Sequence, residues 1–359
     1  MLFLISDEDG GSFTQKLSVK ISMSYPNSTM VCISPSEHLF RQLERTTQNV
    51  MWVQTKFRWL SVSQLFQVLK LLHLDDSKTV FATGYVAHTV GIILGFCSRK
   101  KNRVFVRHFT DSHHSLRKLH WFILDILVNS LASRIIVVSQ RVLDLMQTIE
   151  MVKPEKIHII ENPIDIELFH QVRIQNSQEN IVPHRVILVG RQTRGKGFLT
   201  AIDAFTEFVD LYDNVHLDLF GESSDLTAEI IVRLQRLSSS KYTVHGKVYD
   251  KRLIYSKASV LIHVPERPNF ESFGLVYVEG LAAGLQCIFS ESGILNKRSV
   301  PFTDDYIWFV PHNDKVEIVK RLTTIFLDNE QKKPLPLNSL EHLAEDSVIN
   351  RYINVIKPI

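Results

Sequence analysis

Residues 185–199, RVILVGRQTRGKGFL, carry the pattern of a strand, a tight turn and a helix start. The run VILV at 186–189 is short, apolar and rich in β-branched residues, which is typical of a strand buried on both faces of a parallel sheet. Gly190 then favours a turn, and Lys196-Gly197 predicts the opening of a helix. Such a unit can bind an anion, because free backbone N–H groups and the helix dipole face the end of the strand.

Two cations fall in the same turn. Arg191 and Lys196 would meet a bound anion from fixed positions, as a diphosphate requires. The alternative is an ordinary strand-to-helix turn in which both cations are solvated. This short pattern leaves both interpretations open.

Similar units repeat on both sides of this one. Apolar runs predict strands at 1–6, 30–33, 79–82, 103–107, 134–138 and 157–160, and again at 185–190, 215–221, 242–246, 259–264 and 286–290. Between the two series, residues 162–184 contain Asn162-Pro163, a polar run and Pro183, a composition typical of a linker. We therefore predict an α/β protein with two Rossmann-like, doubly wound domains facing a central cleft. Helical spacing at 340–355 predicts a final helix.

The composition is that of an ordinary globular chain. Its 359 residues, 45% hydrophobic and 22% charged, exclude disorder, collagen and coiled coil. The 41 Lys and Arg residues against 38 Asp and Glu residues leave a net charge of +3, too small to favour nucleic-acid binding. Cys32, Cys97 and Cys287 are far apart, so we expect neither disulfides nor a zinc site and infer a reducing compartment. We expect no signal peptide, because the apolar N-terminus runs into the acidic residues 7–9. We also expect no membrane span, because no stretch approaches the ~18 uncharged apolar residues that a span needs.

A second motif, ESFGLVYVE at 271–279, places two carboxylates eight positions apart. Gly274 predicts a helix start at which backbone N–H groups meet a phosphate or a sugar oxygen. With about two helical turns between them, Glu271 and Glu279 are expected near one helical face, where carboxylates can accept hydrogen bonds from vicinal hydroxyls. The alternative is an N-terminal acid favoured by the helix dipole, together with an exposed glutamate.

These motifs together resemble those of the retaining glycosyltransferases of family four, which have the GT-B fold and a Glu-x7-Glu motif. The resemblance is specific in the C-terminal half, where it rests on residues 189–191, 196–197, 265, 271–276 and 279, with support from 221–222 and 242–246. It is thinner in the N-terminal half, where Val138-Ser139 and the junction residues 162–165 with Phe169 are similar to the family pattern. The family's fold implies an N-terminal acceptor domain, 1–165, joined by 340–359, and a C-terminal donor domain, 166–339.

The resemblance implies a function and a set of site residues. The function is transfer of a hexose from a UDP- or GDP-linked nucleotide sugar to an acceptor hydroxyl, with retention of anomeric configuration and without a metal or another cofactor. The catalytic residues would be Glu271, His108, Arg191 and Lys196. The donor would be bound by Gly11, Arg191, Lys196, Glu271, Phe273, Gly274, Leu275, Glu279 and Val248: the two cations hold the diphosphate, Glu271 and the backbone of 273–275 the sugar, Glu279 the ribose and Val248 the base.

Two of these residues come from the N-terminal half. His108 follows the strand predicted at 103–107, and the resemblance places it near the sugar and the acceptor. The residues 108–114, HFTDSHH, also suggest a metal site, although the family resembled needs no metal. Gly11 belongs to a glycine pair similar to the family's pair facing the donor, and its alternative is a plain turn.

Some positions depart from the family pattern. Residues 284–287, GLQC, stand where the family has Gly-x-Pro-Val, and Ser292-Gly293 stands where it has Gly-Gly. We expect these changes to affect the geometry of the donor loop and the preference for base or sugar. Cys287 is expected to pack in a strand.

The acceptor is expected to be a glycan or lipid-linked glycan in surface polysaccharide synthesis, used by a cytoplasmic enzyme at the inner face of the membrane. Basic residues within 99–118, among them Arg103 and Arg107, and a basic aromatic cluster of Trp52 with 56–59 can bind anionic headgroups. The alternative is that these are solvated faces and loops. Two other function classes are a non-catalytic subunit that binds a sugar nucleotide or glycan, and a nucleic-acid binder, which the net charge disfavours.

Overall fold

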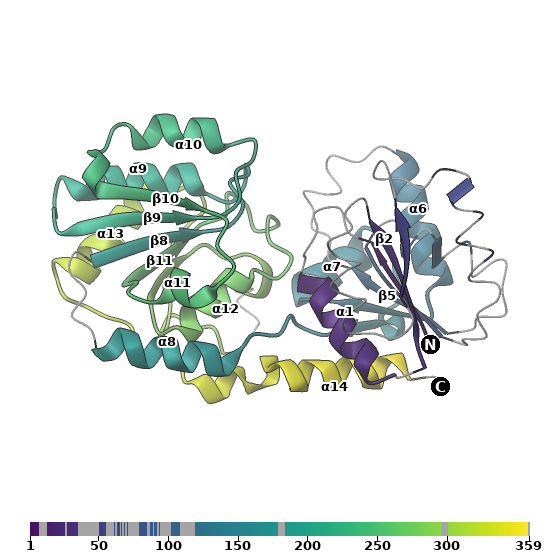
Figure 1. Ribbon diagram of the computed structural model, residues 1–359. Helices are drawn as coiled ribbons and strands as arrows, with labels where there is room; N and C mark the ends of the chain where they lie inside the picture. Colours follow the sequence, from purple (N-terminus) through teal and green to yellow (C-terminus); the bar gives the residue numbers. More distant parts are fainter. Residues whose placement is uncertain are drawn as a thin grey trace. The chain divides into compact units, whose positions relative to one another are not determined.

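The computed structural model describes residues 1–6, 13–25, 27–34, 50–54, 61, 63, 64, 66, 68, 70, 79–84, 87, 88, 90, 91, 93, 102–107, 119–178, 184–295 and 301–357. The chain divides into two compact units, one formed by Met1–Glu161 with Asp346–Ile359 and the other by Asn162–Glu345. Each unit has a parallel sheet flanked by helices (Figure 1). The predicted fold class, two Rossmann-like domains with a C-terminal helix returning to the first, is therefore confirmed.

The first unit is built on a seven-stranded sheet of order β3-β2-β1-β4-β5-β6-β7, with all neighbours parallel. Its strands are β1 (Leu2–Ser6), β2 (Thr29–Ser34), β3 (Val50–Gln54), β4 (Thr79–Thr83), β5 (Asn102–Arg107), β6 (Arg134–Val137) and β7 (Ile157–Ile159). The fully described helices beside it are α1 (Phe13–Met23), α6 (Leu119–Leu131) and α7 (Gln140–Thr148), with a short 3-10 helix η1 (Pro154–Lys156).

The edge strand β3 was not predicted from the sequence. Trp52, which was assigned to a basic aromatic cluster, lies in the middle of β3 and packs against the core of the first unit. The other members of that cluster, residues 56–59, lie outside the described residues. Trp52 therefore contributes to packing, because a half-buried edge strand places alternate side chains against the sheet's helices.

The chain ends in α14 (Glu345–Ile356), which belongs to the first unit. Val348, Tyr352 and Ile356, four residues apart, are buried in the core of that unit together with strand residues such as Phe81. The helix predicted at 340–355 is in fact two elements. Its first part is the 3-10 helix η4 (Leu337–Leu343), which packs in the second unit, where Ile164 N donates a hydrogen bond of 2.9 Å to Leu343 O.

The second unit has a six-stranded parallel sheet of order β10-β9-β8-β11-β12-β13. Its strands are β8 (His184–Val189), β9 (Val215–Phe220), β10 (Tyr242–Gly246), β11 (Val260–His263), β12 (Gln286–Phe289) and β13 (Trp308–Phe309). Its helices are α8 (Ile166–Gln178), α9 (Phe198–Val209), α10 (Thr227–Leu234), α11 (Lys251–Tyr255), α12 (Leu275–Ala282) and α13 (Lys315–Phe326), with 3-10 helices η2 (Ser239–Lys241) and η3 (Gly293–Leu295). Cys287 is buried in β12, as predicted.

The linker predicted at 162–184 is wrong, because α8 occupies most of it. Phe169 and Val172 are buried in the second unit, and Asp165 Oδ1 accepts a hydrogen bond of 2.9 Å from Leu168 N at the start of the helix. The polar residues toward the end of α8 lie at more exposed positions. The polar residues in the C-terminal half of α8 give this segment a linker-like composition. The division between the two compact units falls between Glu161 and Asn162.

No helix within the described ranges is long and apolar enough to cross a membrane. The strongly apolar helix α6 is interrupted by Asp125 and Asn129, which are buried. Both contact Arg107 at the end of β5: its Nη2 lies 3.0 Å from Asp125 Oδ1, and its Nη1 donates to Asn129 Oδ1 at 2.9 Å. Arg107 Nη2 also lies 3.0 Å from Glu150 Oε1. Arg107 was predicted to lie on a basic surface; it is 1% exposed instead, since two carboxylates neutralise it within the fold.

Candidate active site

The turn that carries Lys196 follows β8 and leads into α9, as the sequence predicted. Gly197, which precedes α9, has a φ of 77°, and a Cβ atom there would collide with the carbonyl group of Val264. This close approach brings the start of α9 against the chain leaving β11, and it requires glycine. No side-chain hydrogen bond from the described residues caps α9, so its first N–H groups can bind a ligand.

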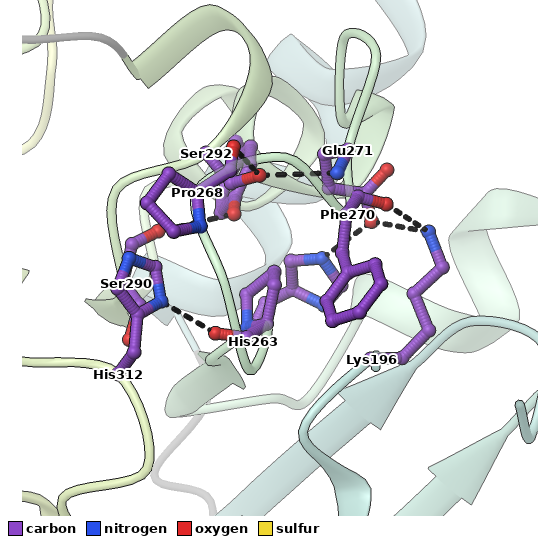
Figure 2. Close-up of polar contacts among 10 residues, drawn as sticks. Lys196, His263, Pro268, Phe270, Glu271, Ser290, Ser292 and His312 are labelled. Atoms are coloured by element: carbon purple, nitrogen blue, oxygen red, sulfur yellow. Dashed lines mark hydrogen bonds and ion pairs between the residues drawn. The ribbon is translucent and has the colours of Figure 1, made fainter. Parts of the chain in front are cut away.

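Glu271 lies between Lys196 and His263 (Figure 2). Lys196 Nζ is 2.7 Å from Glu271 Oε1, and His263 Nε2 is 2.9 Å from the same oxygen. His263 is the last residue of β11, which pairs directly with β8. Because the carboxyl ends of adjacent parallel strands meet at one edge of a sheet, side chains from both turns converge there. A cation, a carboxylate and an imidazole therefore lie together at the ends of the two central strands.

The loop between β11 and α12 holds Glu271 in this position. Ser292 Oγ accepts a hydrogen bond of 3.0 Å from Glu271 N and donates one of 2.7 Å to Pro268 O. Lys196 Nζ donates to Phe270 O at 3.4 Å, and His312 Nδ1 donates to Pro265 O at 2.6 Å (Figure 2). The loop is thus connected to three neighbouring segments of the second unit.

Glu271 is ionised at neutral pH. Burial by itself would raise its pKa, but the Lys196 ammonium and the hydrogen bond from His263 outweigh burial and lower the pKa to about 2. A carboxylate accepts hydrogen bonds and cannot donate them. His263 Nε2 therefore carries the proton of the hydrogen bond to Glu271.

The helix α12 begins after Gly274, whose φ of 82° and contact with the Tyr277 ring require glycine. As at α9, no side-chain hydrogen bond from the described residues caps this helix. The predicted backbone donors Phe273, Gly274 and Leu275 lie at its start, and Phe273 O is held by Ile294 N at 2.9 Å. The expectation that Glu271 shares a face of α12 with Glu279 is wrong. The helix begins only at Leu275, after the left-handed Gly274, so Glu271 lies in the preceding loop.

Glu279 is on α12, is 5% exposed and has its own partners. Tyr255 Oη donates a hydrogen bond of 2.6 Å to Glu279 Oε2, and Lys251 Nζ lies 3.1 Å from the same oxygen. Burial, followed by the charge of Glu279, raises the pKa of Tyr255 well above its usual value. The alternative of an exposed second glutamate is therefore excluded. The two glutamates occupy separate environments.

Arg191 and Val248 lie in two other loops of the second unit. Arg191 is exposed in the turn after β8, next to Gln192, which is buried and accepts a hydrogen bond of 2.7 Å from Thr227 Oγ1. Val248 is half-buried in the loop between β10 and α11, at the end of the sheet edge formed by β10. Gln192 N donates a backbone hydrogen bond of 3.0 Å to Glu222 O, which connects the turn after β8 to the segment after β9.

The site residues predicted from the N-terminal half, His108 and Gly11, lie outside the described residues. So do the acidic run 7–9, the metal alternative at 108–114 and most of the basic segment 99–118. The last residue before His108 is Arg107, which is fixed in the buried cluster with Asp125 and Glu150.

Sequence reasoning missed His263 and Ser292. His263 was counted within a strand predicted at 259–264, and Ser292 was noted only as a departure from a glycine pair. A histidine at the end of an otherwise apolar, buried strand, two residues before Pro265, was the signal available in the sequence.

Two family models match this chain, one on each unit. Residues 28–168 match the model described as Glycosyltransferase Family 4, and residues 171–339 match the one described as Glycosyl transferases group 1. The chain is a GT-B glycosyltransferase. No curated protein sequence matches this glycosyltransferase significantly.

Solved structures similar to this GT-B glycosyltransferase include Anabaena HepE in complex with UDP and glucose, with a TM-score of 0.79, 17% identity and 99% of each chain covered. Sucrose-phosphate synthase from Thermosynechococcus elongatus has a TM-score of 0.73 and 17% identity, with 99% of this chain and 98% of that one covered. The lipopolysaccharide outer core galactosyltransferase WaaB, in its apo form, has a TM-score of 0.73 and 12% identity, with 99% of this chain and 98% of that one covered. At these identities the likeness shows the fold.

Proposed function

We propose that this glycosyltransferase transfers a hexose from a nucleotide diphosphate sugar to an acceptor hydroxyl, with retention of anomeric configuration. The observation that carries the proposal is the pair formed by Lys196 and Glu271, 2.7 Å apart at the carboxyl ends of β8 and β11. A nucleotide sugar brings a diphosphate and a hydroxylated ring joined by one bond. The pair offers a cation for the first and a hydrogen-bond acceptor for the second.

Lys196 and Arg191 bind the diphosphate in this proposal. They stabilise the negative charge that develops on it as the bond between the sugar and the phosphate breaks. The uncapped start of α9, next to Lys196, supports anion binding by backbone N–H groups. The leaving phosphate accepts the proton of the acceptor hydroxyl, whose oxygen bonds to the sugar on the same face. No metal and no other cofactor takes part.

Glu271 binds hydroxyls of the donor sugar near the reacting carbon. Its low pKa supports this role, because a carboxylate that stays ionised accepts hydrogen bonds from hydroxyls and does not supply a proton. The backbone N–H groups of Phe273, Gly274 and Leu275 assist at the start of α12. Glu279 binds the ribose, and Val248 lies near the base. From the first unit, Gly11 and His108 complete the donor and acceptor sites.

The donor and acceptor classes are also part of the proposal. HepE was solved with UDP and glucose, so UDP-glucose is the first donor to test, with GDP-linked hexoses next. The acceptor is a glycan or a lipid-linked glycan of a surface polysaccharide, used by a cytoplasmic enzyme bound peripherally at the inner face of the membrane. The similar fold of WaaB, a lipopolysaccharide outer core galactosyltransferase, supports an acceptor of this kind.

The test is a thermal-shift screen of UDP- and GDP-linked hexoses, followed by an assay for release of the free nucleotide diphosphate. A ligand that binds only the folded state raises the melting temperature. We expect one donor to stabilise the wild type and the Lys315→Ala control, in which an exposed lysine paired with Glu207 is removed, and to stabilise Lys196→Ala much less. Equal shifts in all three proteins would contradict the site assignment.

Binding and turnover are separated by the second assay. Nucleotide diphosphate release that increases on addition of a glycan acceptor supports a transferase. Donor binding without hydrolysis or transfer to any acceptor favours instead a non-catalytic subunit that binds sugar nucleotides.

A further inference from the structure

His263 is a buried polar side chain that the proposed reaction does not use. It is 3% exposed and stands at the end of β11, whose other residues are apolar. Burying an imidazole costs free energy unless its polar atoms are hydrogen-bonded, and the partner of Nε2 is Glu271 Oε1 at 2.9 Å. The position of this ring is therefore connected directly to the carboxylate proposed to bind the sugar.

Both donors to Glu271 meet the same oxygen. Lys196 Nζ and His263 Nε2 lie 2.7 and 2.9 Å from Oε1, whereas Oε2 accepts no hydrogen bond from any described residue. Two donors on one oxygen fix the rotation of the carboxylate and leave the second oxygen for a ligand (Figure 2). The 12% exposed fraction of the Glu271 side chain is consistent with a partly open oxygen.

The imidazole of His263 is itself held in place. Its ring packs edge-to-face on Tyr277, with centroids 4.9 Å apart and an interplanar angle of 73°. Tyr277 in turn donates a hydrogen bond of 3.1 Å to Ser290 O and packs edge-to-face on Phe289, also at 4.9 Å. These contacts come from α12 and β12, so the ring is supported by two elements of the sheet and its helices.

The two donors differ in what a bound diphosphate does to them. Lys196 is charged, and its ammonium is drawn toward a diphosphate, which weakens its hold on Glu271. His263 reaches Glu271 through its Nε2–H from the end of β11, where the ring is 3% exposed, so it stays in the interior of the second unit when a diphosphate binds. The imidazole can therefore keep the carboxylate oriented while the lysine is engaged elsewhere.

We infer that His263 is a positioning residue: it holds Glu271 Oε1 so that Oε2 faces the hydroxyls of the donor sugar when Lys196 binds the diphosphate. The inference rests on the proposed function. It assigns His263 to recognition of the sugar and not of the nucleotide.

Two substitutions separate the hydrogen bond from the packing. His263→Phe keeps an aromatic ring against Tyr277 and removes the N–H donor. His263→Gln removes the ring and keeps an amide donor that can reach Glu271. If His263 acts by positioning, the Phe variant should lose about tenfold in kcat/KM for the nucleotide sugar, as expected when a hydrogen bond to a charged group is lost, and Gln should recover most of it.

The comparison with free nucleotide diphosphate distinguishes positioning from damage to the fold. The dissociation constant of UDP, or of GDP if that is the base used, should stay within about twofold in both variants, because Glu271 contacts the sugar. Equal losses for nucleotide and nucleotide sugar, or equal behaviour of Phe and Gln, would overturn the inference. Failure of the wild type itself to bind any nucleotide sugar would instead overturn the proposed function.

The hydrogen bond is also testable without a donor. Nitrogen-15 NMR of the imidazole in the wild type should show a proton on Nε2, and the Nε2 signal should shift in Glu271→Gln. A ring protonated only at Nδ1, or a signal indifferent to Glu271, would refute the positioning role whatever the outcome of the donor assays.

Discussion

Replacing Lys196 by Ala removes the cation that keeps Glu271 ionised within the fold. The pKa of Glu271 lies at about 2 against an ordinary value of 4.5, because the Lys196 ammonium and His263 outweigh the effect of burial. A shift of this size corresponds to about 3 kcal/mol of folding free energy at neutral pH. Without Lys196 the pKa of Glu271 rises, so Lys196→Ala should lose most of this amount at pH 7.

The sign of the pH dependence follows from a depressed folded-state pKa. The stabilisation from Glu271 is complete above pH 4.5, where the carboxyl ionises in both states, and is lost as the pH falls toward 2. At pH 3 about half of it remains in the wild type. The difference between wild type and Lys196→Ala should therefore be largest at pH 7 and about half as large at pH 3.

The measurement is urea unfolding of both proteins at pH 7, 5 and 3. Lys315→Ala is the matched control, because Lys315 and its partner Glu207 are both exposed, and an exposed ion pair contributes little to stability at any pH. A Lys196→Ala variant as stable as the wild type at pH 7, or a difference that does not shrink on acidification, would refute the electrostatic account of this pair.

Four further outcomes can be measured. Arg191→Ala should lower kcat/KM because it removes about 2–4 kcal/mol of transition-state stabilisation. Initial rates of nucleotide diphosphate release measure this, and unchanged turnover would contradict the diphosphate assignment. Tyr255→Phe removes the hydrogen bond to Glu279 and should weaken nucleotide binding by about 1–2 kcal/mol, as measured by calorimetry. Gly197→Ala should lower the melting temperature more than Gly246→Ala, since both have positive φ but only Gly197 meets a carbonyl group. In a flotation assay, the protein should float with anionic vesicles at low salt and separate from them at high salt. Absence of salt-sensitive binding would contradict the proposed membrane contact.

The sequence predicted most strands because buried parallel strands are short, continuous apolar runs, and this signal is local. It does not predict β3, a half-buried edge strand, and it predicts a linker at α8 because polar residues are clustered in the C-terminal half of that helix. The turn at Gly190 to Gly197 was found for the same local reason, since a left-handed glycine and a helix start are adjacent in the chain.

The partners of the site residues could not be predicted in this way. Glu271 was found from its place in a motif, but the residues that set its protonation come from the turn after β8 and from the end of β11. Their convergence depends on the pairing of two strands about 75 residues apart in the chain, which no window of the sequence contains. The same holds for Arg107, for which the sequence predicts a surface cation. Its carboxylate partners lie on α6 and after α7, and no local pattern connects them to β5.

The charges of the site also bear on which ligand it prefers. Lys196 and Glu271 neutralise each other at 2.7 Å, so an anion that binds Lys196 must compete with a carboxylate already in place. Inorganic phosphate brings no sugar hydroxyls to Glu271, and a neutral sugar brings no negative charge to Lys196. A ligand with a diphosphate and hydroxyl donors side by side satisfies both groups at once, since each loses one partner and gains another. In the function proposed above, selectivity for an intact nucleotide sugar thus follows from the ion pair, with His263 in its proposed role keeping the carboxylate oriented during the exchange.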